Sequence, residues 1–172
     1  MTTIQRRNAE MVALLQADLL PATDRNLAAE FYNSATGTTF TGTVTAPLDT
    51  TRLNLATGLF SLVSNALTIA QAGIYRLAYH ATVGHSTGSS EAVVDFWLDQ
   101  DPATTVFAEV PATKTFVRIP GTSWGSGGAV CILRAYAGYR YRIIADRDSG
   151  SDTLQFLAQG VRLSVECLYL MP

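Results

Sequence analysis

The chain has 172 residues, of which 48% are hydrophobic, and its formal net charge is −2. This length suits one domain with a substantial core, and the hydrophobic content excludes a disordered chain. The arginines are scattered and the balance is slightly acidic, so we expect no nucleic-acid partner. No apolar run approaches the roughly 18 residues that cross a bilayer. The N-terminus is a poor signal peptide, so we expect no membrane partner and a chain kept in the cytoplasm.

Residues 4–20 have the pattern of an amphipathic helix that ends at Pro21. A second, short helix is predicted over 25–33, closed by Gly37. Helices of this kind cannot bury their apolar side chains alone, so they must lie on the main domain, on a neighbouring chain or on another protein. The sequence therefore predicts a helical arm over residues 1–36. The apolar residues that recur at helical spacing in the first helix are Ile4, Met11, Val12, Leu15 and Leu19.

After Gly37 the chain turns to short alternating runs of threonine, valine and aromatic residues, separated by glycine and proline. No helical pattern interrupts them, so a parallel α/β sheet is not expected. The spacing predicts an all-β fold over 37–172, an antiparallel sandwich of about eight to ten strands. The predicted strands cover 39–47, 59–64, 66–73, 74–83, 92–98, 113–120, 127–136, 138–146 and 161–170.

Alternation along these runs predicts which side chains enter the core. In the run over 74–83 the inward set begins at Tyr75, and in the run over 92–98 it begins at Val94. The last run is predicted to turn Val165 and Tyr169 inward. The full inward sets are Tyr75, Leu77, Tyr79, Ala81 and Val83, then Val94, Phe96 and Leu98, then Tyr139, Tyr141 and Ile143, then Val161, Leu163, Val165, Cys167 and Tyr169.

The only two histidines, His80 and His85, stand five residues apart in one predicted strand. An odd spacing places them on opposite faces, with Cα atoms roughly 16 Å apart at about 3.3 Å per residue. We therefore expect no shared metal site or catalytic base here, and a serine hydrolase has no base to use.

Two acidic stretches are weak candidate sites. The segment 146–152, "DRDSGSD", resembles a calcium loop but has leucine where the last EF-hand ligand would stand, so a solvated turn and a calcium site both stay open. Asp95 and Asp99 share a strand face, but nothing else in the sequence completes a glycosidase. Cys131 and Cys167 are expected to be buried free thiols, because no export signal is evident. We expect no catalytic residue, no resident metal and no cofactor.

Four stretches carry a resemblance to the jelly rolls of the tumour-necrosis-factor and complement-type superfamily, in particular the short versions in phage structural proteins. They are "FTGTVTAP", "LTIAQAGIYRLAYHATV", "AVCILRAYAGYRYRIIAD" and "RLSVECLYL". Together they span about residues 38–170. The family hairpin usually has an acidic residue after its glycine, whereas here Gly138 is followed by Tyr139. The resemblance implies a ten-stranded jelly roll that assembles as a homotrimer, held by aromatic and aliphatic side chains of one sheet.

Some predicted strands carry apolar side chains on both faces, which agrees with that implied assembly. A lone sandwich needs only one apolar face per sheet, so the second face is expected to meet another subunit. The candidate trimer-interface residues are Val93, Trp97, Leu168 and Leu170.

The resemblance also implies a function: a non-enzymatic virion protein, a decoration or cement protein on the outer capsid surface of a tailed phage, made in the host cytoplasm. Its partner would be the major capsid protein, whose adjacent capsomers it would bridge. The arm residues expected to make that contact are Leu14, Leu15, Leu19 and Leu20, although they could equally pack on their own domain.

The alternative function is the receptor- or carbohydrate-binding tip of a phage fibre, with recognition by the loops at 84–91 and 121–128. That function predicts a fibre shaft before the domain. No repeat or collagen-like tract precedes the first helix, which favours decoration.

Overall fold

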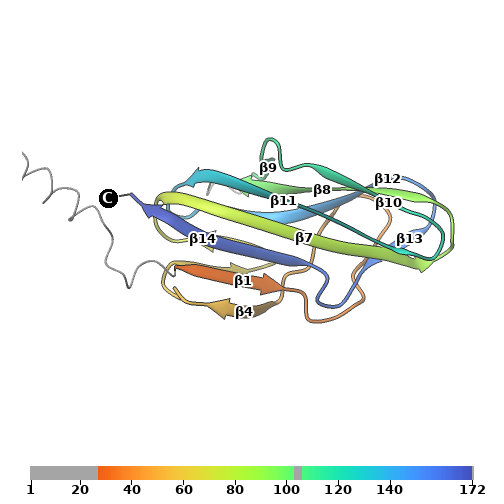
Figure 1. Ribbon diagram of the computed structural model, residues 1–172, viewed down its shortest axis with the longest axis horizontal. Coiled ribbons are helices and arrows are strands. Elements are labelled where there is room, and N and C mark those ends of the chain that lie inside the picture. The colour runs from red at the N-terminus through yellow and green to blue at the C-terminus, as the bar shows by residue number, and fades with distance from the viewer. Residues whose placement is uncertain (1–26, 103–105, 172) are drawn as a thin grey trace, which may run out of the picture.

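A computed structural model of the chain describes residues 27–102 and 106–171 (Figure 1). The described residues contain fourteen β-strands and no helix, and the strands form two antiparallel sheets of seven strands each. The sheets face each other across one hydrophobic core. The predicted fold class, an antiparallel jelly-roll sandwich, is confirmed.

Sheet A runs in the order β2, β13, β7, β14, β1, β4, and β11 also pairs with β7. The central strand, β7, therefore has neighbours along both of its edges. The bounds are β1 (Ala28–Tyr32), β2 (Thr39–Phe40), β4 (Thr50–Asn54), β7 (Gly73–Thr87), β11 (Trp124–Ala135), β13 (Thr153–Phe156) and β14 (Arg162–Leu170).

Sheet B runs in the order β10, β8, β12, β6, β5, with β3 on β12 and β9 on β8. Residues 39–47, predicted as one strand, divide between the two sheets: β2 lies in sheet A and β3 in sheet B. The bounds are β3 (Val44–Thr45), β5 (Phe60–Val63), β6 (Ala66–Ile69), β8 (Ala92–Asp101), β9 (Ala108–Glu109), β10 (Thr115–Ile119) and β12 (Arg140–Ser149).

The inner face of β7 builds the centre of the core. The five residues predicted to point inward from Tyr75 to Val83 are all buried, as are Val94, Phe96 and Leu98 on the facing strand β8. The Tyr79 hydroxyl crosses between the sheets, 2.9 Å from the Phe96 carbonyl oxygen and 2.6 Å from that of Thr113. A hydroxyl at this depth needs such partners, because an unpaired buried polar group costs about 1–3 kcal/mol.

Residues 25–33 were predicted as a short helix, and this prediction is wrong. Residues 28–32 form strand β1, which lies between β14 and β4. Ala29 and Phe31 point into the core, and the intervening Glu30 points out. The alternation of period two decided the structure, and pairing on both edges overrode the helix propensity of alanine and glutamate. The sandwich thus includes residues 28–36, which the sequence had assigned to the arm.

The last strand departs from its predicted alternation. The register of β14 on β7 shifts between Cys167 and Tyr169. Such a bulge reverses the alternation beyond it. As a result Tyr169 is 43% exposed and Leu170 packs against the core, the opposite of the prediction.

Glycines let β10 pass close over the first half of β11. A Cβ on Gly125 would lie 2.7 Å from the Val117 side chain of β10, and one on Gly127 would lie 3.2 Å from the Thr115 hydroxyl of β10 and 2.8 Å from the Phe96 ring of β8. The two strands belong to different sheets, so this contact closes the gap between the sheets along the first half of β11. Along the second half of β11, the inward residues Ala129, Cys131 and Leu133 are only half-buried.

Substitution Gly127→Ala is expected to lower the free energy of unfolding by about 1–3 kcal/mol, because the added methyl overpacks the contact with Phe96. Gly58→Ala is the matched control, since a Cβ there meets no atom within 4 Å. Urea denaturation of both variants measures the difference. Equal stabilities would show that β11 does not pack tightly against Phe96 of β8 in solution.

Candidate interaction surface

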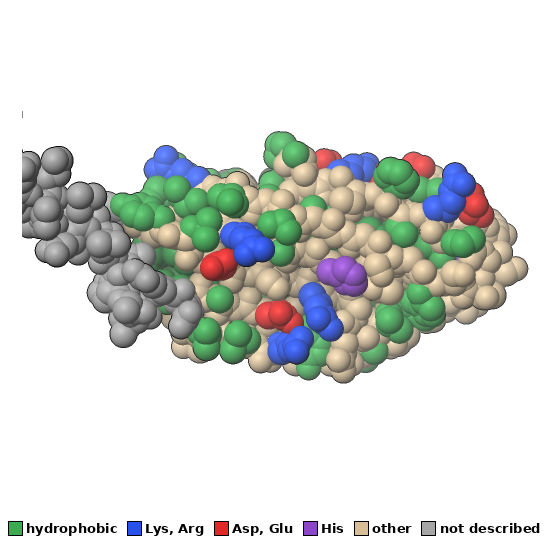
Figure 2. All heavy atoms as spheres, viewed as in Figure 1, with side chains coloured by type: hydrophobic (Ala, Val, Ile, Leu, Met, Phe, Trp, Pro, Cys, Tyr) green, Lys and Arg blue, Asp and Glu red, His purple; other side chains and the backbone are tan. Residues whose placement is uncertain are grey.

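The outer face of sheet A carries exposed apolar side chains at the end where the C-terminus lies. Ile132 is 65% exposed on β11, and Tyr169 of β14 pairs directly with Ile74 of β7. Together with Met171 and Arg134 they line a shallow hollow of about 360 Å³. Figure 2 shows apolar side chains gathered at this end and charged side chains in the middle of the face. We call the exposed set Ile74, Val130, Ile132, Leu168 and Tyr169 the apolar patch.

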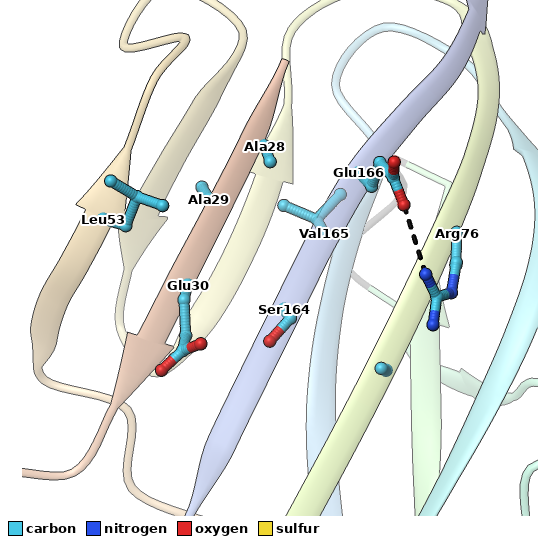
Figure 3. A pocket seen from close by; sticks show the side chains of 9 residues that line it. Ala28, Ala29, Glu30, Leu53, Arg76, Ser164, Val165 and Glu166 are labelled. Carbon is cyan, nitrogen blue, oxygen red and sulfur yellow. Dashed lines mark hydrogen bonds and ion pairs between the residues drawn. The ribbon is translucent and has the colours of Figure 1, made fainter. Parts of the chain in front are cut away.

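Beside this patch the same face is concave. Small side chains, Ala28, Ala78 and Ser164, leave a hollow of about 320 Å³ between β1, β14 and β7 (Figure 3). Leu53, 47% exposed, lies on its β4 side, and the ion pair of Arg76 with Glu166 at 3.3 Å crosses its other rim. We call it the alanine hollow. Sheet A thus offers exposed apolar side chains along β11 and a recess at β1 and β14.

The outer face of sheet B differs because its charges satisfy one another. Lys114 contacts Asp95 at 2.7 Å and lies over the Trp97 ring, 5.1 Å from its centroid. The Trp97 indole donates to Asp99, which also accepts from Arg142 at 3.0 Å.

Arg142 in turn stacks on Phe107, 3.8 Å from the ring centroid, and the neighbouring Arg140 pairs with Asp101. Asp95 and Asp99, considered above as a catalytic pair, are therefore partners of Lys114 and Arg142.

The four predicted trimer-interface residues lie in both sheets. Val93 and Trp97 belong to β8 in sheet B, where Trp97 is engaged by Asp99 and Lys114. Leu168 and Leu170 belong to β14 in sheet A, where Leu168 is 42% exposed and joins the apolar patch. Leu170 packs on the core. The structure brings only one of the four into the patch.

Sequence reasoning did not single out Ile74, Val130 and Ile132. Each alternates with an inward residue in a predicted strand, so the signal was the apolar character of the second face of the runs over 74–83 and 127–136. The predicted capsid contacts Leu14, Leu15, Leu19 and Leu20 lie outside the described residues.

The two histidines do not share a site. His80 is exposed on the outer face of sheet A, whereas the His85 side chain is 3% exposed and lies 3.3 Å from Asp152. Within the 146–152 segment Asp152 accepts from the Ser90 amide, and Asp146 accepts from Thr43. These two carboxylates therefore hold different loops. Among the described residues no three His, Cys, Asp or Glu side chains converge as metal ligands.

Cys131 and Cys167 are free, half-buried thiols on the two strands that flank β7. Both point toward the core, and burial raises the pKa of each thiol. In the described part of the chain, no helix is long and apolar enough to span a bilayer.

Comparison with known proteins identifies the fold, but no family and no function. No protein-family model matches the chain. No curated protein matches it either. Among solved structures it is similar to the Eiger TNF of S. frugiperda, with a TM-score of 0.63 at 11% identity, covering 85% of this chain and 94% of that one. Murine APRIL, in structures at pH 5.0 and pH 8.5, matches with a TM-score of 0.52 at 10% identity, over 82% of this chain and 98% of the other. The expected TNF-type jelly-roll fold is therefore confirmed.

The two thiols are expected to react with a disulfide reagent at pH 7.5 at least about tenfold more slowly than in urea-unfolded protein. Burial restricts the access of the reagent to each sulfur. Because the pKa of each thiol is raised above its ordinary value, little of the reactive thiolate is present at this pH. Absorbance-monitored thiol titration gives both rates. Two thiols that react at the unfolded rate would contradict the inward packing of β11 and β14.

Proposed function

We propose that this chain is a non-enzymatic structural protein, which forms a homotrimer through the outer face of sheet A and decorates the capsid of a tailed phage. The observation that carries the assembly is the apolar patch. Its five side chains are each 39–65% exposed, and they gather at one end of one face. Contiguous exposed apolar surface on a folded protein is typical of an interface.

The shape of sheet A supports a ring of identical copies. A ring requires two different surfaces that meet head to tail. The β11 edge, with Val130 and Ile132 exposed, lies on one side of β7, and the alanine hollow lies on the other side, where β14 and β1 follow. In the proposed trimer the edge of one copy fills the hollow of the next. The TNF-type fold, which the sequence resemblance associates with trimers, supports the same number of copies.

Each buried apolar contact in such a ring contributes about 25 cal/mol per Å² removed from water. Sheet B offers fewer such contacts at its centre, since Trp97 and Phe107 on its outer face are already stacked with cations and the exposed Phe116 on β10 lies opposite Asp95. Sheet A is therefore the face we assign to self-association.

The capsid setting rests on the resemblance to phage decoration proteins. The segment before β1 would reach the major capsid protein through Leu14, Leu15, Leu19 and Leu20, and the trimer would sit on the outer capsid surface and bridge capsomers. β1 begins beside the last residues of β14, where the Leu27 carbonyl accepts from the Cys167 amide. Leu27, the first described residue, therefore lies next to Leu168 of the apolar patch.

Substitution Ile132→Glu is expected to convert the trimer, about three times 18.5 kDa, into monomers. A carboxylate buried in the interface without a partner would weaken association by at least about tenfold. Light scattering on wild type and variant measures the mass. Val63→Glu is the control, because Val63 is 59% exposed on the edge strand of sheet B. A wild-type monomer, or equal effects of both changes, would refute the sheet A assembly.

Deleting residues 1–26 is expected to leave the native mass trimeric and to abolish binding to undecorated capsids. The deletion keeps β1 intact, and the expected loss follows from removing the four leucines. Cosedimentation with stripped capsids measures binding, and heating of decorated and bare capsids measures stabilisation. A truncated trimer that still binds would place the capsid contact on the jelly roll itself.

A further inference from the structure

Arg162 stands out among the arginines of the described residues. Five of the others contact a carboxylate or a backbone carbonyl oxygen through a terminal guanidinium nitrogen, Arg118 contacts Glu91 through its Nε, and Arg134 stacks on Tyr136. Arg162 uses only its Nε, which donates to the Gln159 carbonyl at 3.3 Å. The two terminal nitrogens have no acidic partner within the described part of the chain. They are available to an anion in the forked geometry that guanidinium offers.

Arg162 lies between two hollows on the outer face of sheet A. The larger, about 480 Å³, is lined by His80, Thr82, the turn over 157–160 and Arg162. The smaller, about 220 Å³, is lined by Glu30, Tyr32, Arg52, Gln159 and Arg162. Arg162 and Gln159 line both. These hollows lie toward the β13–β14 turn, beyond the alanine hollow and the apolar patch.

The wall that holds Arg162 is rigid. Asn33, fully buried, donates to the Leu157 carbonyl at 2.7 Å and accepts from the Val161 amide at 2.8 Å. Gln159 adopts a positive φ of 57°, and the Thr82 amide donates to Gly160 at 3.0 Å. A turn fixed in this way holds the Gln159 carbonyl oxygen that the Arg162 Nε contacts, which reduces the entropy lost when a ligand binds.

The other polar groups suit a hydroxylated ligand. The His80 Nδ1 lies 3.2 Å from the Gly160 carbonyl oxygen, which can only accept, so this nitrogen carries a hydrogen, and the His80 ring lines the larger hollow. The Gln159 amide adds a donor and an acceptor, and Leu157, 36% exposed, supplies an apolar surface, while the buried Thr82 hydroxyl is already bonded to Ser126 at 2.8 Å. The one acid nearby, Glu30, is held by Arg52 at 3.1 Å.

We infer that Arg162 and its two hollows form a binding site for an acidic monosaccharide, with the carboxylate on the Arg162 guanidinium and the ring hydroxyls over His80 and Gln159. The larger hollow exceeds the needs of a bare ion and lies within the range of small-ligand sites, about 300–1,000 Å³. This inference goes beyond the proposed assembly, and it places recognition away from the loops at 84–91 and 121–128.

Titration calorimetry of the full chain with N-acetylneuraminate and with glucuronate tests the inference, with glucose and inorganic sulfate as the comparison ligands. At least one of the two sugar acids should bind more tightly than either comparison ligand. Arg162→Gln should weaken that binding at least about tenfold, and Arg162→Lys should recover only part of it, because lysine lacks the fork. Arg118→Gln, an exposed arginine on sheet B paired with Glu91, is the matched control and should bind as wild type does.

Failure of both sugar acids to bind, equal binding of glucose, or an unchanged Arg162→Gln would overturn the inference. Equal binding of sulfate would overturn the sugar assignment. The native mass of each variant is measured in parallel. A trimeric Arg162→Gln that has lost the ligand supports the site, whereas loss of both mass and binding would place Arg162 in the subunit contact and overturn it.

Discussion

The pairing of β7 along both edges is the constraint on which the rest of this structure depends. β11 runs along one side for twelve residues, and β14 and then β13 run along the other. With both edges paired, the inner face of β7 must point at sheet B, and the Tyr79 hydroxyl reaches across to its backbone. The outer face must then point away from the core, so any contact its side chains make lies outside this sandwich.

The outer faces of the two sheets differ in how far their apolar side chains are covered. On sheet B, Lys114 and Arg142 are ion-pair partners and also cover the rings of Trp97 and Phe107, whereas Phe116 on β10 stays exposed. On sheet A, small residues such as Ala78 and Ser164 leave the backbone near the surface, and Ile132 is 65% exposed among the described residues. The centre of sheet B is thus covered by its own side chains, and sheet A has a recess and exposed apolar side chains.

The sequence predicted side-chain burial correctly where one alternating pattern continued over many residues. The alternation from Tyr75 to Val83 fixed a buried face and showed that His80 and His85 could not converge. Prediction from the sequence failed where long-range pairing decided the conformation, as in β1, whose partners lie at residues 50–54 and 162–166. It also failed at the β14 bulge, because one extra residue reverses every later side chain. The Arg162 hollows draw on β1, β4, β7 and β14, which no local pattern assembles.

The position of β14 has a consequence for how the chain is made. β14 lies between β7 and β1, so β1 can pair with β4 early but joins the rest of sheet A only after residue 162 has been synthesised. Asn33 likewise bonds to residues 124 and 128 positions later in the chain. Sheet A therefore cannot close on a nascent chain whose last strand is still inside the ribosome. Until β14 has been made, β1 and β4 form a separate strand pair with no connection to β7 in sheet A.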